Sequence, residues 1–168
     1  MGVAGSGKTT LSREIVRRVC AVYIDNNHIA DAFSPHTRDG RRYQRMRPHF
    51  YKALYAITEE NLKVGNSVLL DVPHVKEMQL PAWRASVRGL ITRTGVKLIV
   101  IRCCCSEMSL YQRILSRCEP RDRWKLTHWQ EFLSKEPIDV PIPFPHLDVD
   151  TEQDVSRNIR KAVEYILG

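Results

Sequence analysis

Short apolar runs alternate along the chain with longer segments whose apolar residues recur every three or four positions. The longer segments are typical of helices with one buried face, as Leu11, Ile15 and Val19 illustrate. The runs have the length of strands buried on both faces, and they cover residues 21–25, 67–71, 96–103 and 146–150. This alternation predicts an α/β fold, a mainly parallel sheet between two helical layers, in a single domain over residues 1–168.

Several residues mark where the helices begin and end. Pro48 is suited to the first position of a helix, which the apolar spacing from Phe50 to Val64 continues up to Gly65. Residues 34–47, polar and rich in arginine, predict a loop or a broken helix. Thr127 and Gln130 form a capping box that predicts the start of another helix. A helix after Ser106 should bury Tyr111, Ile114, Leu115 and Cys118.

Residues 2–9 read GVAGSGKT and match the pattern G-x-x-x-x-G-K-[ST]. A loop of this kind turns its backbone N–H groups toward phosphate oxygens, and the following helix adds its positive end. We therefore expect a nucleotide triphosphate to bind through a set of consecutive residues, namely Gly5, Ser6, Gly7, Lys8, Thr9 and Thr10. Lys8 should reach the β- and γ-phosphates, and the Thr9 hydroxyl should be a ligand of Mg²⁺.

Two aspartates end apolar runs at the edge of the sheet where ligands of such folds bind. Asp25 and Asp71 are the last residues of these runs. Asp71 is expected to hold Mg²⁺, and Asp25 is expected either to orient the metal or to accept the proton of an attacking hydroxyl. Each could instead cap the turn that follows its strand.

The arginines fall into two groups. Arg113, Arg117 and Arg121 belong to a basic segment at about residues 113–126, which we expect to form a lid that stabilises the charge of a transferring phosphoryl group. Arg41, Arg42, Arg45 and Arg47 form the second group, which could hold an acceptor or lie in solvent. For His28, His49 and His74 we expect structural roles.

The composition narrows the class of protein. A formal net charge of +7 favours anionic partners, and no apolar run is long enough to cross a membrane, so we expect a cytoplasmic protein. The five cysteines contain no C-x-x-C pair, which argues against a zinc site.

The chain resembles bacterial phosphate-loop kinases of the gluconate-kinase and shikimate-kinase type, and more closely the relatives labelled AAA-family ATPase or predicted kinase. The resemblance covers almost the whole chain and depends on the segments GVAGSGKTT, YIDNN, MRPHFYKALYAITEENLKVGNSVLLDVPH and PRDRWKLTHWQEFL. It implies a P-loop NTPase fold with a five-stranded sheet, ATP and Mg²⁺ as cofactors, and phosphoryl transfer to a hydroxyl of a small molecule. It also implies that Arg47 contacts the acceptor and that Arg113, Arg117 and Arg121 serve the lid and the adenine side.

The chain departs from this family at two places. Relatives commonly carry D-x-D after the second strand, whereas this chain has Asp25, Asn26 and Asn27, so Asn27 can contact the substrate but cannot act as a base. The first, central strand of the family has no counterpart before the phosphate-binding loop. We therefore expect Met1 to be an internal methionine of a longer natural protein.

Two other functions fit the same residues. The first is a nucleotide-binding ATPase or switch without a small acceptor. The second is a nucleic-acid kinase or RNA-binding protein, which the basic charge and the mixed basic and aromatic residues 41–51 would support.

Overall fold

The structure is a computed structural model that describes residues 1–34, 38 and 40–168. Strands and helices alternate along the chain, as the apolar pattern predicts. The four strands are β1 (Val22–Asp25), β2 (Val68–Asp71), β3 (Val100–Cys104) and β4 (His146–Asp150). The longer helices are α1 (Lys8–Val16), α2 (Asn26–Phe33), α3 (Arg41–Lys63), α4 (Pro81–Thr94), α5 (Glu107–Ser116) and α8 (Val155–Leu167). The shorter ones are η1 (Glu77–Gln79), η2 (Pro120–Asp122), α6 (Arg123–Thr127) and α7 (Trp129–Lys135).

The strands form two parallel pairs with the N-terminal residues between them. β1 pairs with β2, so that Asp25 lies opposite Asp71, and β3 pairs with β4. The main chain of Met1 bonds to β3 through Ile101 and Cys103, and the Gly2 N–H donates to the Pro73 carbonyl just after β2. The chain therefore enters the phosphate-binding loop between the two pairs.

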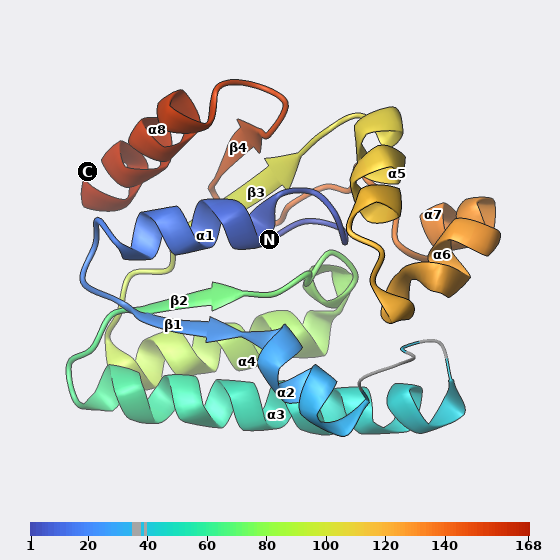
Figure 1. Ribbon diagram of the computed structural model, residues 1–168. Coiled ribbons are helices and arrows are strands. Elements are labelled where there is room, and N and C mark those ends of the chain that lie inside the picture. Colours follow the sequence, from blue (N-terminus) through green and yellow to red (C-terminus); the bar gives the residue numbers. More distant parts are fainter. Residues whose placement is uncertain (35–37, 39) are drawn as a thin grey trace.

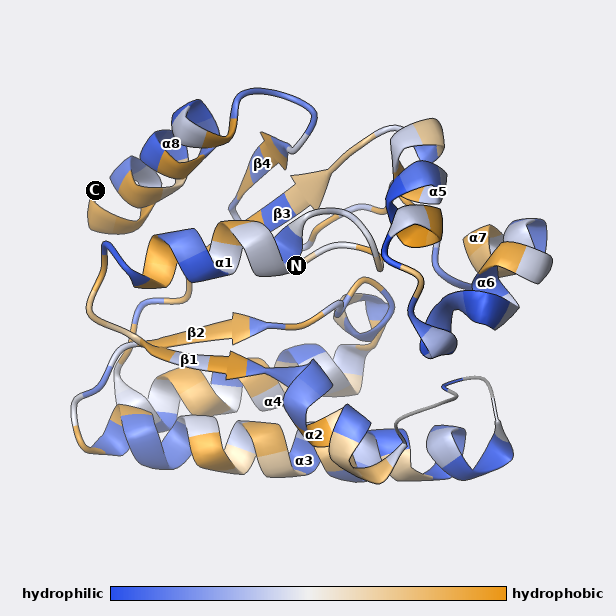
Figure 2. Ribbon diagram, viewed as in Figure 1, coloured by the Kyte–Doolittle hydropathy of each residue, from blue (hydrophilic) through white to orange (hydrophobic). Residues whose placement is uncertain are grey.

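Helices cover both faces of the strands (Figure 1). α1 packs on β1, β2 and α8, whereas α3 packs on the opposite side against β1, β2 and α4. β1 and β2 are mainly apolar, whereas the helices on either side of them alternate apolar and polar residues (Figure 2). The arrowheads of β1, β2 and β3 point toward the end of the molecule that carries α5, α6 and α7 (Figure 1), so the lid segment lies at the carboxyl edge of the sheet.

Two predicted helix starts are wrong. α3 begins at Arg41 and runs through Pro48, because Tyr43 and Phe50 on either side of the proline pack into one cluster with Ala30. This packing outweighs the one backbone hydrogen bond that a proline removes. Residues 35–37 and 39 of the predicted loop lie outside the described residues. Thr127 does not cap α7, because its hydroxyl donates back to the Arg123 carbonyl at 3.0 Å, and His128 precedes the helix instead.

Some predicted buried faces and strand limits also differ. α5 buries Leu110 and Ile114 against the phosphate-binding loop, so Tyr111, Leu115 and Cys118 of the predicted inner face are exposed. Phe50 and Leu54 are buried on α3 as expected, whereas Ile57 and Val64 are exposed. β3 begins at Val100 rather than residue 96 because its partner begins only at His146, after Pro145.

Candidate nucleotide and acceptor site

The phosphate-binding loop wraps tightly at the N-terminus of α1. Gly7 precedes the helix with φ 84°, in the left-handed region that glycine adopts most readily. A Cβ atom there would lie 3.1 Å from the Thr151 side chain, and one at Gly5 would lie 2.9 Å from Ile114. Glycine is therefore required by the backbone angle and by the close packing of α5 and the β4–α8 turn.

Lys8 bonds within the loop, whereas Thr9 bonds to the end of β2. The Lys8 ammonium donates to the Val3 carbonyl at 2.8 Å, and burial lowers the pKa of Lys8 although the nearby Asp71 opposes the shift. The Thr9 hydroxyl donates to Asp71 Oδ2 at 2.6 Å. Thr9 and Asp71 thus meet as the sequence predicts, and their hard oxygen atoms fit the one or two protein ligands that Mg²⁺ usually takes.

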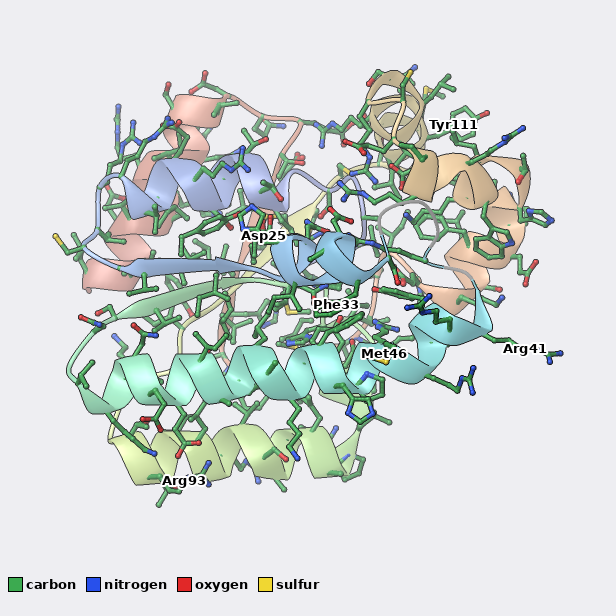
Figure 3. All side chains as sticks on the ribbon, turned by 60° about the horizontal axis from the view of Figure 1, so that its bottom comes forward. Asp25, Phe33, Arg41, Met46, Arg93 and Tyr111 are labelled. Atoms are coloured by element: carbon green, nitrogen blue, oxygen red, sulfur yellow. The ribbon has the colours of Figure 1, made fainter. Side chains whose placement is uncertain are left out.

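Asp25 is placed differently from Asp71. It is 4% exposed, and its Oδ1 accepts from the Asn27 N–H at 2.8 Å, which caps α2. Figure 3 labels Asp25 beside the start of α2. Burial raises its pKa, and the neighbouring carboxylate of Asp71 acts in the same direction. Tyr23, which sequence reasoning missed, lies between the two acids and donates to Asp71 Oδ2 at 3.0 Å.

The lid arginines each have a separate partner. Arg113 donates to the Thr151 hydroxyl at 2.7 Å and to the Thr151 carbonyl at 2.8 Å, which joins α5 to the turn before α8. Arg117 pairs with the buried Asp122, which also binds Lys125 at 2.5 Å. Arg121 pairs with Asp31 on α2 rather than with Asp122.

The predicted acceptor residues, Asn27 and Arg47, lie on α2 and α3. Arg47 pairs with Glu77 at 2.7 Å and lies over the Tyr51 ring. The Asn27 amide oxygen accepts from Arg38 at 2.8 Å, and Arg38 also pairs with Asp31. Asp31 is therefore shared by Arg38 and Arg121, whose hydrogen bonds lower its pKa although burial alone would raise it. Arg41, in contrast, extends outward from the end of α3 (Figure 3).

A cavity of about 990 Å³ brings most of the predicted residues together. Its walls contain Gly5, Gly7, Lys8, Thr9, Thr10, Asn27, Arg47, Asp71, Arg113, Arg117 and Arg121. Ser6 and Asp25 are absent from the walls, and both are buried. In the described part of the chain, no cluster of three or more His, Cys, Asp or Glu side chains could hold a metal ion. The candidate Mg²⁺ site therefore depends on Thr9, Asp71 and the bound phosphates.

Several cavity residues carry no signal in the sequence. Thr151 and Asn158 come from β4–α8, and the Asn158 amide donates to the Asp150 carbonyl at 2.7 Å. Arg38, Lys76 and Lys125 add positive charge to the walls. The clustering of Arg121, Arg123 and Lys125 is visible in the sequence, but which of them turn inward depends on tertiary packing.

Comparison with known proteins agrees with this geometry. The profile of the AAA domain family matches residues 1–135, and the chain belongs to this family of phosphate-binding-loop proteins. None of the curated protein sequences compared with the chain matches it significantly.

Solved structures share the fold. A Chloroflexus aurantiacus protein provisionally classed as a kinase aligns with a TM-score of 0.74 and 22% identity, over 98% of this chain and 95% of its own. A sugar kinase from Janibacter aligns with a TM-score of 0.72 and 16% identity, over 99% and 91%. The Mycobacterium tuberculosis APS kinase, bound to AMPPNP and APS, aligns with a TM-score of 0.64 and 15% identity, over 100% and 95%. The predicted α/β P-loop NTPase fold is confirmed.

Proposed function

We propose that this chain transfers the γ-phosphoryl group of MgATP to a hydroxyl group of a small molecule. The observation that carries the proposal is the extent of the cavity, which reaches from the phosphate-binding loop to Arg47 and Tyr51 on α3. Its volume of about 990 Å³ is at the upper end of the range of roughly 300–1,000 Å³ found for small-molecule sites. A nucleotide bound at the loop would leave the α3 side available for an acceptor.

The loop and the lid supply the donor half of the site. The backbone N–H groups of the loop, the N-terminus of α1 and Lys8 would bind the β- and γ-phosphates. Thr9 and Asp71 would hold Mg²⁺, which neutralises charge on the phosphate oxygens when bound. Arg113 and the Thr151 turn would border the nucleoside. Arg117 would face the transferring group, and Lys125 shares its partner Asp122.

Besides binding the donor, the site has to position the acceptor hydroxyl for attack on the γ-phosphoryl group. Asp71 is the aspartate that lines the cavity among the described residues, whereas the Asp25 carboxylate is occupied by the N-cap of α2. As catalytic residues we propose Lys8, Arg117 and Arg121, with Asp25 in a supporting role that orients Asn27. Phosphoryl transfer proceeds through a loose transition state in most analyses, so positioning and electrostatic stabilisation account for most of its catalysis without a strong base.

We also propose that the protein works in the cytoplasm, where MgATP is available. All five cysteines are free thiols. No helix in the described part of the chain is long and apolar enough to cross a membrane.

A panel of hydroxyl compounds, assayed for MgATP-dependent ADP release and for a phosphorylated product, tests the proposal. At least one compound should accelerate ADP release in proportion to product, and Lys8→Met should abolish the effect. ATP hydrolysis that no compound accelerates would favour the ATPase or switch instead. Oligonucleotide binding that weakens steeply with salt would favour the nucleic-acid function.

A further inference from the structure

His74 is held in an unusual backbone conformation beside the acceptor half of the cavity. It follows β2 with φ 48°, in the left-handed region that residues with a Cβ rarely adopt. Its ring is buried, with ring centroids of Tyr51 at 4.8 Å, Trp83 at 5.3 Å and Tyr55 at 5.7 Å. Such a conformation persists where the surroundings determine it, and it is common at ligand sites.

The hydrogen bonds around the ring favour one of its two neutral tautomers. Trp83 Nε1 donates to the Tyr55 hydroxyl at 3.0 Å, and that hydroxyl lies 2.5 Å from His74 Nε2. An indole N–H can only donate, so the one proton of Tyr55 is free to be donated to Nε2. Burial lowers the pKa of His74 to about 3, so the ring is neutral. With Tyr55 donating to Nε2, the ring proton is on Nδ1, on the side of the Glu77 carboxylate.

Two buried polar atoms next to this ring have no hydrogen-bond partner among the described residues. They are His74 Nδ1 and Glu77 Oε2, which lie 3.9 Å apart. The other oxygen of Glu77 pairs with Arg47 at 2.7 Å. A donor thus faces an acceptor across a gap that a small side-chain movement would close, on the side of Glu77 remote from the cavity arginine.

The positive charge of the cavity walls exceeds the negative charge that a bound nucleotide would bring. Among the described residues, three acidic side chains line the cavity, against nine basic ones: Lys8, Arg38, Arg47, Lys76, Arg113, Arg117, Arg121, Lys125 and Lys135. Asp31, Glu77 and Asp122 neutralise part of this charge through the ion pairs already described, which leaves three positive charges in excess. Mg²⁺ reduces the charge of the triphosphate, so an excess remains for a second anion.

We propose that Arg47 binds an oxyanion of the acceptor, a carboxylate or a phosphate, and that Glu77 and His74 are positioning residues that hold the Arg47 guanidinium toward the cavity. The identity of the ligand as the acceptor rests on the proposed function, whereas the anion site does not. His74 Nδ1–H donates to Glu77 Oε2 when the anion is bound, and Glu77 is then bonded at both oxygens. Arg47 presents its remaining N–H groups to the ligand.

Two variants of His74 separate a donor role from a packing role. His74→Phe keeps a ring but has no donor, whereas His74→Asn loses the ring, tolerates a positive φ and places an amide N–H near the position of Nδ1. Both replacements are uncharged, as the neutral His74 ring is, so neither variant changes the charge at position 74. If His74 acts as a donor, anion affinity should follow the order wild type, Asn, Phe. If it acts only by packing, Phe should exceed Asn.

The experiment measures anion binding to protein saturated with MgAMPPNP, so that the phosphate-binding loop is already filled. Inorganic phosphate and malonate are titrated in separate arms at constant ionic strength, with tryptophan fluorescence as the readout. We expect saturable binding. The anion that binds more tightly, phosphate or malonate, indicates whether the site prefers a phosphate or a carboxylate. Arg47→Met should abolish it, and the matched exposed Arg45→Met should preserve it. His74→Phe should weaken it about tenfold, the typical value of a hydrogen bond to a charged group, and His74→Asn by less.

Three results would overturn the proposal in part or whole. Absence of saturable binding in the wild type excludes the anion site, and unchanged binding in Arg47→Met excludes Arg47. A Phe variant that binds as well as or better than the Asn variant excludes the donor role of His74. No turnover is involved, so an inactive chain that binds anions would contradict the proposed function alone. A kinase that accepts neutral hydroxyl compounds and binds neither anion would contradict this proposal alone.

Discussion

Thr9 and Asp71 lie 62 residues apart in the chain, and the hydroxyl of one donates to the carboxylate of the other at 2.6 Å. The contact joins the first turn of α1 to the end of β2. It brings together the loop threonine and the strand-end aspartate that we propose as ligands of Mg²⁺.

Replacing Asp71 should uncouple nucleotide binding from the metal. In Asp71→Asn we expect MgATP to bind about tenfold more weakly, or worse, because a metal ligand loses its charge. Metal-free ATP should bind at least as well as to the wild type, because a carboxylate that repels phosphate is gone. Titration of ATP with and without Mg²⁺ measures both quantities. Asp139→Asn, whose side chain is 93% exposed, is the control. An unaltered Mg²⁺ dependence in Asp71→Asn would remove Asp71 from the metal site.

Replacing Lys8 should remove the stabilisation that the nucleotide confers. A ligand at about 100 times its Kd stabilises a protein by about 2.7 kcal/mol, and Lys8→Ala should lose the corresponding shift in Tm because the phosphates lose their ammonium partner. Thermal unfolding with and without MgATP measures the shift. Lys63→Ala changes an exposed lysine at the end of α3 and should retain it. A full shift in Lys8→Ala would refute the assigned phosphate site.

Replacing Gly7 should destabilise the fold by more than backbone strain alone. Gly7→Ala forces a Cβ into a position with φ 84° and within 3.1 Å of Thr151. Gly65→Ala is a matched control, because φ is 88° there and a Cβ would meet nothing within 4 Å. We expect about 1–2 kcal/mol from the strain at either site, and an additional loss only at Gly7.

Denaturant unfolding gives both values. Thr151→Ser, combined with Gly7→Ala, should restore part of the difference because it removes the Cγ2 methyl group of the clash. Equal losses at Gly7 and Gly65 would show that the loop does not depend on its contact with the β4–α8 turn.

His74 should make stability fall in mild acid. Burial lowers its folded pKa to about 3, below the ordinary value of about 6.5 that it regains on unfolding. Between these values the unfolded chain binds more protons, so the free energy of unfolding decreases as pH falls, by about 1.4 kcal/mol per pH unit from this residue. The contribution is complete above pH of about 6.5.

The free energy of unfolding of the wild type and of His74→Phe, measured from pH 7 to pH 4.5, tests this expectation. Below pH of about 6, the slopes of the two curves against pH should differ by an amount that corresponds to the uptake of about one proton on unfolding. His49→Gln, an exposed position on α3, should keep the wild-type slope. Parallel curves for His74→Phe and the wild type would show that the pKa of His74 is not lowered in the folded protein.

The sequence was sufficient for the features that depend on local patterns. The glycine-rich loop, the alternation of strands and helices, and the placement of Asp71 beside Thr9 all follow from residue spacing and from the rule that parallel strands end at one edge. Asp25 shows a limit of that reasoning, because a strand-end aspartate can cap the next helix as readily as it can face a ligand. The structure has it bonded to the Asn27 N–H.

The partners of the arginines could not be predicted. Arg121 pairs with Asp31, which lies 90 residues earlier in the chain, and Arg113 pairs with Thr151, which carries no motif. His74 was expected to be structural because its partners Tyr55, Glu77 and Trp83 meet only when α3, η1 and α4 pack together. Side-chain pairs of this kind depend on tertiary packing, and spacing along the chain does not encode them.

The bond from the Lys8 ammonium to the Val3 carbonyl holds the lysine side chain within the phosphate-binding loop. The lysine side chain is ordered during folding, so little of its rotamer entropy remains to be lost when phosphate arrives. Binding then exchanges one acceptor for a more strongly charged one, and the ammonium has a neutral oxygen to return to when the product leaves. A phosphate-binding loop built in this way loses less conformational entropy when the nucleotide binds, which favours affinity.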